Sequence, residues 1–240
     1  AMQVGGVTDR GAVRQQNQDA YAARVLEDGR VIALVGDGMG GARAGNVAST
    51  MAVERFMEEF FKPGQDGPVE ERIGHAASVA NQEIFARSIH DAACTGMGTT
   101  LVAVLAGEQA AVLLNEGDSR AYHIAQGQIR RITRDHSLVE DLVQRGELTR
   151  EEARVHPHRN LITRALGSEP ELRADYFRQP LEPGDLLLLC SDGLSNMLTD
   201  QELLEETARN DGLEACCQRL LQRALERGAP DNVTAVLIQR

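Results

Sequence analysis

Five aspartates stand in settings that suit metal chemistry. Three are next to glycine and four border an apolar run: Asp19 in RQQNQDAY, Asp37 in VGDGMGG, Asp118 in NEGDSRAY, Asp192 in LLLLCSDGLSN and Asp231 in GAPDNVTAVL. Carboxylates that gather in one place repel one another, so they must take up protons or hold cations. Because no cysteine and histidine set accompanies them, hard cations such as Mg²⁺ or Mn²⁺ fit best. A single aspartate of this kind is more simply a turn or cap residue, and it is the repetition that favours a shared site.

The segment VIALVGDGMGGARAG, residues 31–45, also matches a second type of site. Gly36, Gly38 and Gly41 follow an apolar run and precede a helical pattern, which is the spacing of a dinucleotide-binding loop. That type of site needs a parallel βαβ unit and an acidic residue about 20 residues further on, at the end of the next strand. Glu58 and Glu59 lie near that distance but within an amphipathic helical pattern, and Asp37 would face the pyrophosphate. The dinucleotide interpretation is therefore disfavoured.

The charge of the chain limits its partners. It has 25 basic and 36 acidic residues among 240, a formal net charge of −11. That balance argues against a general nucleic-acid binder. It also repels a phosphorylated substrate at long range, unless bound divalent cations invert the local field.

The composition favours a folded cytoplasmic protein. Hydrophobic residues make up 42% of the chain, which suits a packed globular domain. No apolar run is long enough to span a bilayer, and the first residues have no secretory pattern. Cys94, Cys190, Cys216 and Cys217 form no C-x-x-C pair, so we expect four reduced thiols.

The order of the predicted elements indicates antiparallel sheets. Buried strands are predicted at 31–35, 99–105, 110–114, 186–190 and 233–238, with a hairpin around Gln126-Gly127. Helices are predicted at 44–62, 69–90, 137–145, 149–155, 200–209 and 212–227. Because strands and helices do not alternate regularly, a doubly wound parallel sheet is disfavoured. Antiparallel sheets packed together, with helices outside, fit better.

An ordered series of motifs resembles a known family. The motifs are RQQNQDA, DGMGG, GMGTT, GDSRAY, DHSLV, RNLITRALG, CSDGL and DNVT. In this order they resemble the bacterial metal-dependent Ser/Thr protein phosphatases of the PPM, or type 2C, family. The resemblance runs from about Val7 to the C-terminus and implies one domain over residues 1–240. The implied fold is α+β, a four-layer α-β-β-α sandwich of two antiparallel sheets flanked by helices.

The resemblance also implies roles for individual residues. Asp37 would bridge two Mg²⁺ or Mn²⁺ ions, and the carbonyl of Gly38 would bind one of them. Asp192 and Asp231 would complete the other ion's ligands, and Asp19 would act at the first metal through a water. Asp118, with Asp192, would support a third ion. Arg14 would hold the substrate phosphate, and residues 137–167 would form a mobile flap. A water or hydroxide between two such ions is activated for attack on phosphorus.

Four positions depart from the family pattern. Gln18 and Asn46 stand where glutamate is common, Ala42 replaces a histidine, and Glu116 replaces a valine before GDSR. The change at Ala42 removes an expected general acid, although a metal-bound water could serve instead. His136, His156 and His158 lie in or near the flap, and we expect structural or surface roles for them.

The leading hypothesis is a metal-dependent phosphoserine/phosphothreonine protein phosphatase that opposes a bacterial Ser/Thr kinase. Its partners would be phosphorylated proteins and that cognate kinase, with no nucleic acid and no membrane, and we expect a monomer. A phosphatase dedicated to one regulator, such as an anti-sigma antagonist, is a related possibility. The alternative from another class is a catalytically weak member of this fold that binds phosphoproteins for regulation.

Overall fold

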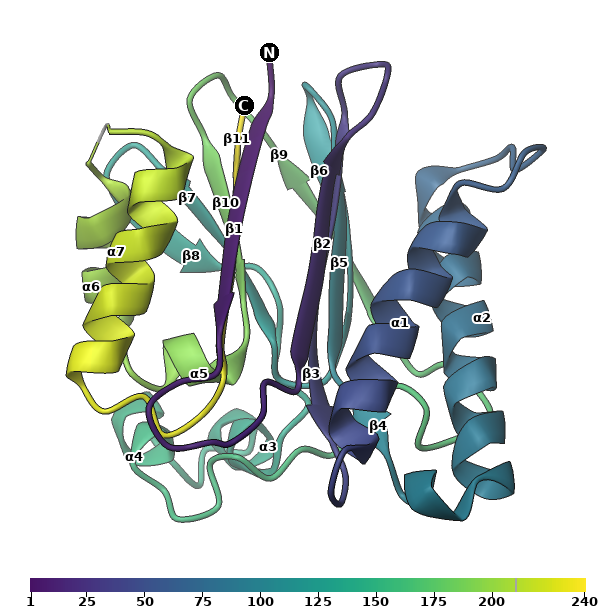
Figure 1. Cartoon of the computed structure of the whole chain (residues 1–240). Coiled ribbons are helices and arrows are strands. Elements are labelled where there is room, and N and C mark those ends of the chain that lie inside the picture. The colour runs from purple at the N-terminus through teal and green to yellow at the C-terminus, as the bar shows by residue number, and fades with distance from the viewer. Residues whose placement is uncertain (210) are drawn as a thin grey trace.

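Two antiparallel β-sheets lie at the centre of the molecule, with helices on both outer faces (Figure 1). The computed structural model describes residues 1–209 and 211–240. The first sheet has the order β1 (Gln3–Asp9), β11 (Val233–Gln239), β10 (Leu186–Cys190), β7 (Arg120–Ala125) and β8 (Gln128–Arg131). The second has the order β2 (Asp19–Val25), β3 (Val31–Met39), β5 (Leu101–Ala106), β6 (Ala110–Glu116) and β9 (Asp175–Pro180), with β4 (Gly98–Thr99) paired to β3. The predicted α+β sandwich is confirmed.

The helices form the two outer layers and one end of the molecule. α1 (Ala44–Phe60) and α2 (Val69–His90) cover the second sheet, while α6 (Asp200–Thr207) and α7 (Leu213–Glu226) cover the first (Figure 1). The short helices α3 (Leu138–Gln144), α4 (Arg150–Arg154) and α5 (Asp192–Ser195) lie at the end opposite the two termini (Figure 1). A 3₁₀ turn, Ala92–Cys94, follows α2. None of the helices in the described part of the chain is long and apolar enough to cross a membrane.

Each central strand is buried on both faces, which explains the unbroken apolar runs in the sequence. In β3, Val31, Ala33 and Val35 pack between the sheets, while Ile32 and Leu34 pack beneath α1 and α2. Alternate side chains of a strand point to opposite faces, so both sets must be apolar here. The same alternation occurs in β11. The four-layer arrangement therefore follows from strands that have no polar face.

The amphipathic helices close the outer layers. In α7 the buried residues Cys216, Cys217, Leu220, Leu221 and Ala224 recur at helical spacing and pack on the first sheet. α6 begins with a capping box, in which Thr199 Oγ1 accepts from the Glu202 N–H at 3.2 Å and Glu202 Oε1 accepts from the Thr199 N–H at 3.0 Å. All four cysteines are buried free thiols, as predicted.

The structure corrects the predicted strands in two ways. The run 99–105 is not one strand, because Thr99 belongs to β4 and β5 begins only at Leu101. Three strands were not predicted, and all three are edge strands: β1, β2 and β9. Edge strands are partly exposed and carry glycine, arginine and aspartate, so they lack a continuous apolar run. The hairpin at Gln126-Gly127 is confirmed, with φ values of 52° and 72°.

Candidate functional site

Asp19 and Asp37 face each other across two neighbouring strands of the second sheet. They are paired in register where β2 begins and β3 ends. Asp37 lies within β3 rather than beyond its end, which corrects the position expected from the sequence. Its N–H donates to Thr100 Oγ1 at 2.9 Å, and its carbonyl accepts from the Thr100 N–H at 3.0 Å. The backbone that carries Asp37 is therefore fixed on both sides.

The first sheet supplies Asp192 and Asp231 from adjacent elements. Asp192 is the first residue of α5, directly after β10, and Asp231 precedes β11. A Cβ on Gly193 would lie 1.8 Å from the carbonyl oxygen of Asn232, so only glycine allows this approach. Gly38 is constrained in the same way, because its Cβ would lie 1.8 Å from the carbonyl oxygen of Gly45. Glycine thus brings backbone segments together around the acids.

The aspartates perturb one another electrostatically, which places them in one cluster. Burial raises the pKa of Asp37 well above its usual range, and repulsion from Asp19, Asp192 and Asp118 adds to this effect. Burial also raises the pKa of Asp19 to about 7, against hydrogen bonds that favour its ionised form. The pKa of Asp118 and that of Asp192 are raised for the same first reason. The sequence-predicted acids are therefore brought together from both sheets.

The cluster has the properties of a divalent-cation site. Asp19 Oδ2 accepts from Thr234 Oγ1 at 2.6 Å, but Asp19 Oδ1 and Asp192 Oδ1 are buried without a hydrogen-bond partner among the described residues. Buried carboxylate oxygens need a partner, and a hard cation supplies one. Within residues 1–209 and 211–240, no group of three or more His, Cys, Asp or Glu side chains meets the geometry for holding a metal ion.

Asp118 stands in the turn between β6 and β7, and a buried histidine supports this turn. The Gly117 N–H donates to His136 Nδ1 at 3.0 Å, and the Gly117 carbonyl accepts from the His136 N–H at 2.9 Å. The other ring nitrogen, Nε2, lies 2.7 Å from Asp175 Oδ2. Both ring nitrogens are thus engaged in holding the loop, which matches the structural role expected for His136.

Arg14 lies beside the cluster on an exposed loop, residues 10–18. Its Nε is 3.5 Å from Asp231 Oδ1, and its side chain is 58% exposed. The loop is held by Asn232, whose Nδ2 donates to the carbonyls of Arg10 and Gln16 while its Oδ1 accepts from the Gln18 N–H. Sequence reasoning did not single out Asn232, although it is the second residue of the DNVT motif. It joins the loop of Arg14 to that of Asp231.

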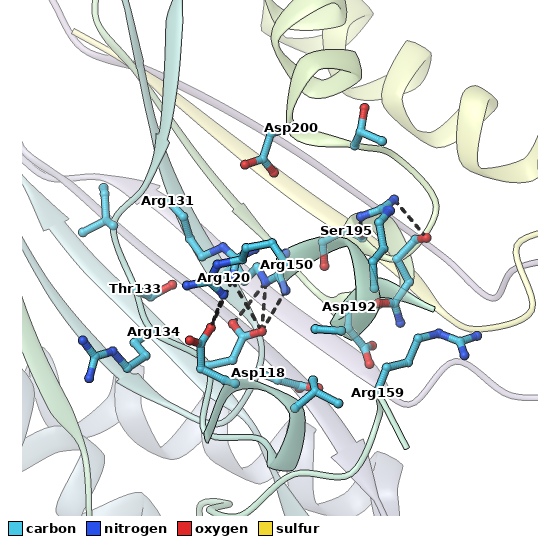
Figure 2. A pocket seen from close by; sticks show the side chains of 18 of the residues that line it. Asp118, Arg120, Arg131, Thr133, Arg134, Arg150, Arg159, Asp192, Ser195 and Asp200 are labelled. Atoms are coloured by element: carbon cyan, nitrogen blue, oxygen red, sulfur yellow. Dashed lines mark hydrogen bonds and ion pairs between the residues drawn. The ribbon is translucent and has the colours of Figure 1, made fainter. Parts of the chain in front are cut away.

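The flap region docks against the helix that begins with Asp192. From α4, Arg154 Nη1 donates to the carbonyl of Ser195 at 3.0 Å and Nη2 donates to that of Asn196 at 3.2 Å. A cleft of about 670 Å³ lies beneath this region, and Asp118 and Asp192 both line it (Figure 2). His156 and His158 lie at the flap surface, where the His158 N–H donates to His156 Nδ1 at 3.0 Å.

Comparison with known proteins identifies the family of this chain. Residues 9–237 match the family model described as protein phosphatase 2C. The chain belongs to the protein phosphatase 2C family. The resemblance inferred from the motifs is thereby confirmed.

Relatives within the protein phosphatase 2C family are similar over nearly their whole length. A Listeria monocytogenes protein named serine/threonine phosphatase stp is 38% identical over 237 residues, which cover 97% of this chain and 94% of the relative. The solved structure of serine/threonine phosphatase Stp1 from Staphylococcus aureus has a TM-score of 0.94 at 34% identity, covering 100% of this chain and 95% of that one. The catalytic domain of the phosphatase PstP, solved in complex with two manganese ions, has a TM-score of 0.88 at 34% identity, with 99% and 97% coverage.

Two of the expected departures from the family pattern, Gln18 and Asn46, make hydrogen bonds that explain an amide there. Gln18 Nε2 donates to the carbonyl of Ala42 at 3.2 Å, and Asn46 Nδ2 donates to the carbonyl of Asn17 at 3.1 Å. Both amides tie the loop of Arg14 to the start of α1. A carboxylate at either position has no proton to donate when ionised, so glutamine and asparagine here act as donors.

The other two expected departures are Ala42 and Glu116. Ala42 adopts φ 50°, in the left-handed region, two residues before α1 begins. Glu116 is buried, and its Oε1 accepts from the Arg173 N–H at 2.9 Å while Oε2 has no partner. Burial raises the pKa of Glu116. Glu116 therefore points toward the segment of Arg173.

Proposed function

We propose that this protein hydrolyses phosphoserine and phosphothreonine in proteins, with Mg²⁺ or Mn²⁺ held by the aspartate cluster. The observation that carries the proposal is the pair of buried, unpartnered oxygens, Asp19 Oδ1 and Asp192 Oδ1, in a chain of the protein phosphatase 2C family. When bound, such ions lower the pKa of a water and offset the charge of a phosphoryl group. The relatives named as serine/threonine phosphatases support this activity.

The residues of the cluster have separate roles in this proposal. Asp37 would be a ligand of both ions, the Gly38 carbonyl of one of them, and Asp192 and Asp231 of the other. Asp19 would act at the first ion through a water, and Asp118 would support a third ion together with Asp192. Burial and the neighbouring carboxylates raise the pKa of Asp37, and a bound cation would offset the repulsion that opposes its ionisation.

Arg14 orients the substrate phosphate in this proposal. Its only ion pair in the described residues is the 3.5 Å contact with Asp231, so four of its five N–H donors remain available for phosphate oxygens. Arginine binds phosphate bidentately, which fixes the phosphorus for attack in line with the departing serine or threonine oxygen. The exposed position of Arg14 allows a phosphorylated segment of another protein to reach it.

The proposed setting follows from the same features. The chain acts on phosphorylated proteins, opposes a cognate Ser/Thr kinase, and works as a monomer in the cytoplasm in one domain with a mobile flap at 137–167. Four buried free thiols suit a reducing compartment. Membranes and nucleic acids are not partners in this proposal, because the net charge of −11 opposes binding to polyanionic surfaces.

Phosphate release from a phosphothreonine peptide tests the proposal. We expect release with Mn²⁺ or Mg²⁺ and none after chelation, and we expect Asp192→Ala to be inactive. Full activity of Asp192→Ala would contradict the assigned site. The second candidate, a phosphoprotein-binding module, is favoured only by the use of Gln18 and Asn46 as loop donors. Its signature would be peptide binding without turnover at saturating Mn²⁺.

A further inference from the structure

The cleft beneath the flap is unusually rich in arginine for so acidic a chain. Six arginines line it, from β7 and β8, the segment after them and the flap: Arg120, Arg131, Arg134, Arg150, Arg154 and Arg159 (Figure 2). The cleft also reaches Asp118 and Asp192, so it is continuous with the candidate metal site. Its volume of about 670 Å³ is large enough for several side chains of a bound segment.

Three of these arginines form ion pairs within the protein. Arg120 makes a bidentate contact with buried Asp135, with Nη2 2.8 Å from Oδ2 and Nε 3.1 Å from Oδ1. Arg131 and Arg150 both reach Glu140 Oε1, at 3.5 and 2.6 Å. These pairs hold the wall of the cleft in place. Because the three arginines share two carboxylates, Asp135 and Glu140, one positive charge remains uncompensated.

The other three, Arg134, Arg154 and Arg159, have no carboxylate within ion-pair distance in the described part of the chain. Arg154 donates only to the carbonyls of Ser195 and Asn196, and Arg159 Nη1 donates to the His156 carbonyl at 3.3 Å. Burial and repulsion from Arg120 lower the pKa of Arg154. A guanidinium has five N–H donors, so each of the three retains donors for an anion.

The acids that share the cleft do not cancel this excess. Asp118 and Asp192 belong to the candidate metal site, where cations offset them. Glu151 and Asp200 line the cleft but are exposed, as is Arg134, so solvent and salt screen the charges of all three. Arg154 and Arg159 are only partly exposed, so their positive charge is screened less and favours an anion beside the candidate metal site.

We propose that this cleft binds a second anionic side chain of the same substrate segment, a phosphorylated residue or an acidic one. The proposal rests on the proposed phosphatase function and names its substrate class: segments in which a second negative group lies near the phosphate to be removed. Arginine recognises planar or tetrahedral oxyanions with paired hydrogen bonds, which suits both phosphate and carboxylate. Arg154 also holds α5, so Arg134 and Arg159 are the residues that test the cleft separately.

A peptide panel tests this proposal. Each peptide contains one phosphothreonine and, at a second position, Ala, Glu or phosphoserine. The distance between the two positions is varied one residue at a time. We expect kcat/KM to rise about tenfold at a favoured spacing, the order expected of one charge-assisted hydrogen-bonded pair. A higher kcat/KM with phosphoserine than with glutamate would show that the cleft prefers a second phosphate. Equal values of kcat/KM would show that an acidic residue is sufficient. The preference should weaken as salt rises.

Variants link the preference to the cleft. In Arg134→Ala/Arg159→Ala the ratio of kcat/KM between charged and Ala peptides should fall close to one. Arg145→Ala is the matched control, because Arg145 is exposed on the same flap but does not line the cleft, and it should keep the ratio. The proposal would be overturned if all peptides had the same kcat/KM. It would also be overturned if the double variant kept the wild-type ratio between charged and Ala peptides. If no peptide is turned over, the proposed function fails, and the ratio is then read from calorimetric dissociation constants with Mn²⁺.

Discussion

The pKa values of acidic side chains are shifted in opposite directions at two places in this molecule. At the aspartate cluster, burial raises the pKa of Asp19 to about 7, and two carboxylate oxygens have no partner. Between α6 and α7, hydrogen bonds from Arg227 and the Thr199 backbone lower the pKa of Glu202 to about 2. Arg223 Nη2 also lies 2.7 Å from Glu202 Oε2, and Arg219 Nε lies 3.1 Å from Glu206 Oε2.

This contrast separates acids that stabilise the fold from acids that are held for a ligand. The α6–α7 acids have arginine partners supplied by the chain, so their ionised form favours the folded state. Apart from Asp231, which Arg14 contacts, the clustered aspartates have no arginine partner in the described part of the chain, so without a cation their ionisation opposes folding. A protein tolerates that cost where function requires it. Substitutions at individual residues test this difference.

The largest effect is expected for Asp37→Asn. Activity on a phosphopeptide should fall by at least about a hundredfold, as when a group that stabilises transition-state charge is lost. In chelator the variant should unfold at a higher temperature than wild type, because burial and repulsion from Asp19 oppose ionisation of Asp37. Phosphate release and scanning calorimetry in EDTA measure both. If the variant loses activity and also unfolds at a lower temperature than wild type in EDTA, the clustered aspartates do not oppose folding as described.

The pH dependence of the metal-free protein follows from Asp19. Its folded pKa of about 7 lies above its unfolded value, so the folded state binds more protons between about pH 4 and 7. Stability in chelator should therefore fall as pH rises through this range. With Mn²⁺ the trend should reverse, because binding requires deprotonated ligands. The denaturant concentration at the unfolding midpoint, measured in chelator from pH 5 to 8, tests this prediction. A midpoint that increases with pH in chelator would refute it.

A smaller effect is expected where the flap meets α5. Arg154→Ala removes two donors to the carbonyls of Ser195 and Asn196, which end the short helix that begins with Asp192. The Mn²⁺ concentration for half-maximal activity should rise about tenfold, as for loss of a residue that orients a metal ligand. Arg154→Lys should lose less, and Arg145→Ala should match wild type. An unchanged metal dependence in Arg154→Ala would remove Arg154 from this positioning role.

Removing the charge of an acid that is paired with arginine should lower stability, the opposite of the effect expected for Asp37→Asn in chelator. Glu202→Gln keeps a capping-box residue but removes the charge that Arg227 and Arg223 contact. We expect Tm to fall by roughly 2–4 °C at pH 7 with activity unchanged. Because the folded pKa is depressed, wild type loses this stabilisation as pH falls from about 4.5 to 2, so the two proteins should converge there. A difference between the two proteins that is as large near pH 2 as at pH 7 would exclude the ion pair as its source.

The smallest effect concerns the loop of Arg14. Gln18→Glu replaces the donor to the Ala42 carbonyl with an acceptor. We expect KM for a phosphopeptide to rise roughly fivefold, equivalent to about 1 kcal/mol for one exposed hydrogen bond. Gln15→Glu introduces the same charge at an exposed position of the same loop. If both variants behave alike, charge and not the hydrogen bond is responsible.

The sequence predicted most of this architecture, and the physical reason lies in the central strands. β3 and β11 are buried on both faces, so their apolar runs are unmistakable, and α7 shows its buried face by spacing. The edge strands β1, β2 and β9 lack such runs because solvent covers part of each. The pairing of Asp19 with Asp37 therefore could not be predicted, since it depends on the register of an edge strand.

The site was predicted as a set of residues but not as a network. The motifs identified the five aspartates and Arg14, whose types carry the chemistry. Asn232 and Thr234 hold these residues through side-chain hydrogen bonds to distant segments, and nothing in their local sequence reveals such long-range partners. The unpaired arginines of the cleft were equally hidden, because which arginine finds a carboxylate is decided by tertiary packing.

Anomalous scattering from a crystal soaked in Mn²⁺ tests the central claim most directly. We predict manganese peaks within ligand distance of Asp37 and of Asp192, close to the oxygens Asp19 Oδ1 and Asp192 Oδ1 that have no protein partner. Binding there should leave Glu202 and Glu206, which are already paired with arginine, without metal. Peaks only at surface acids, with none at Asp37, would contradict the account.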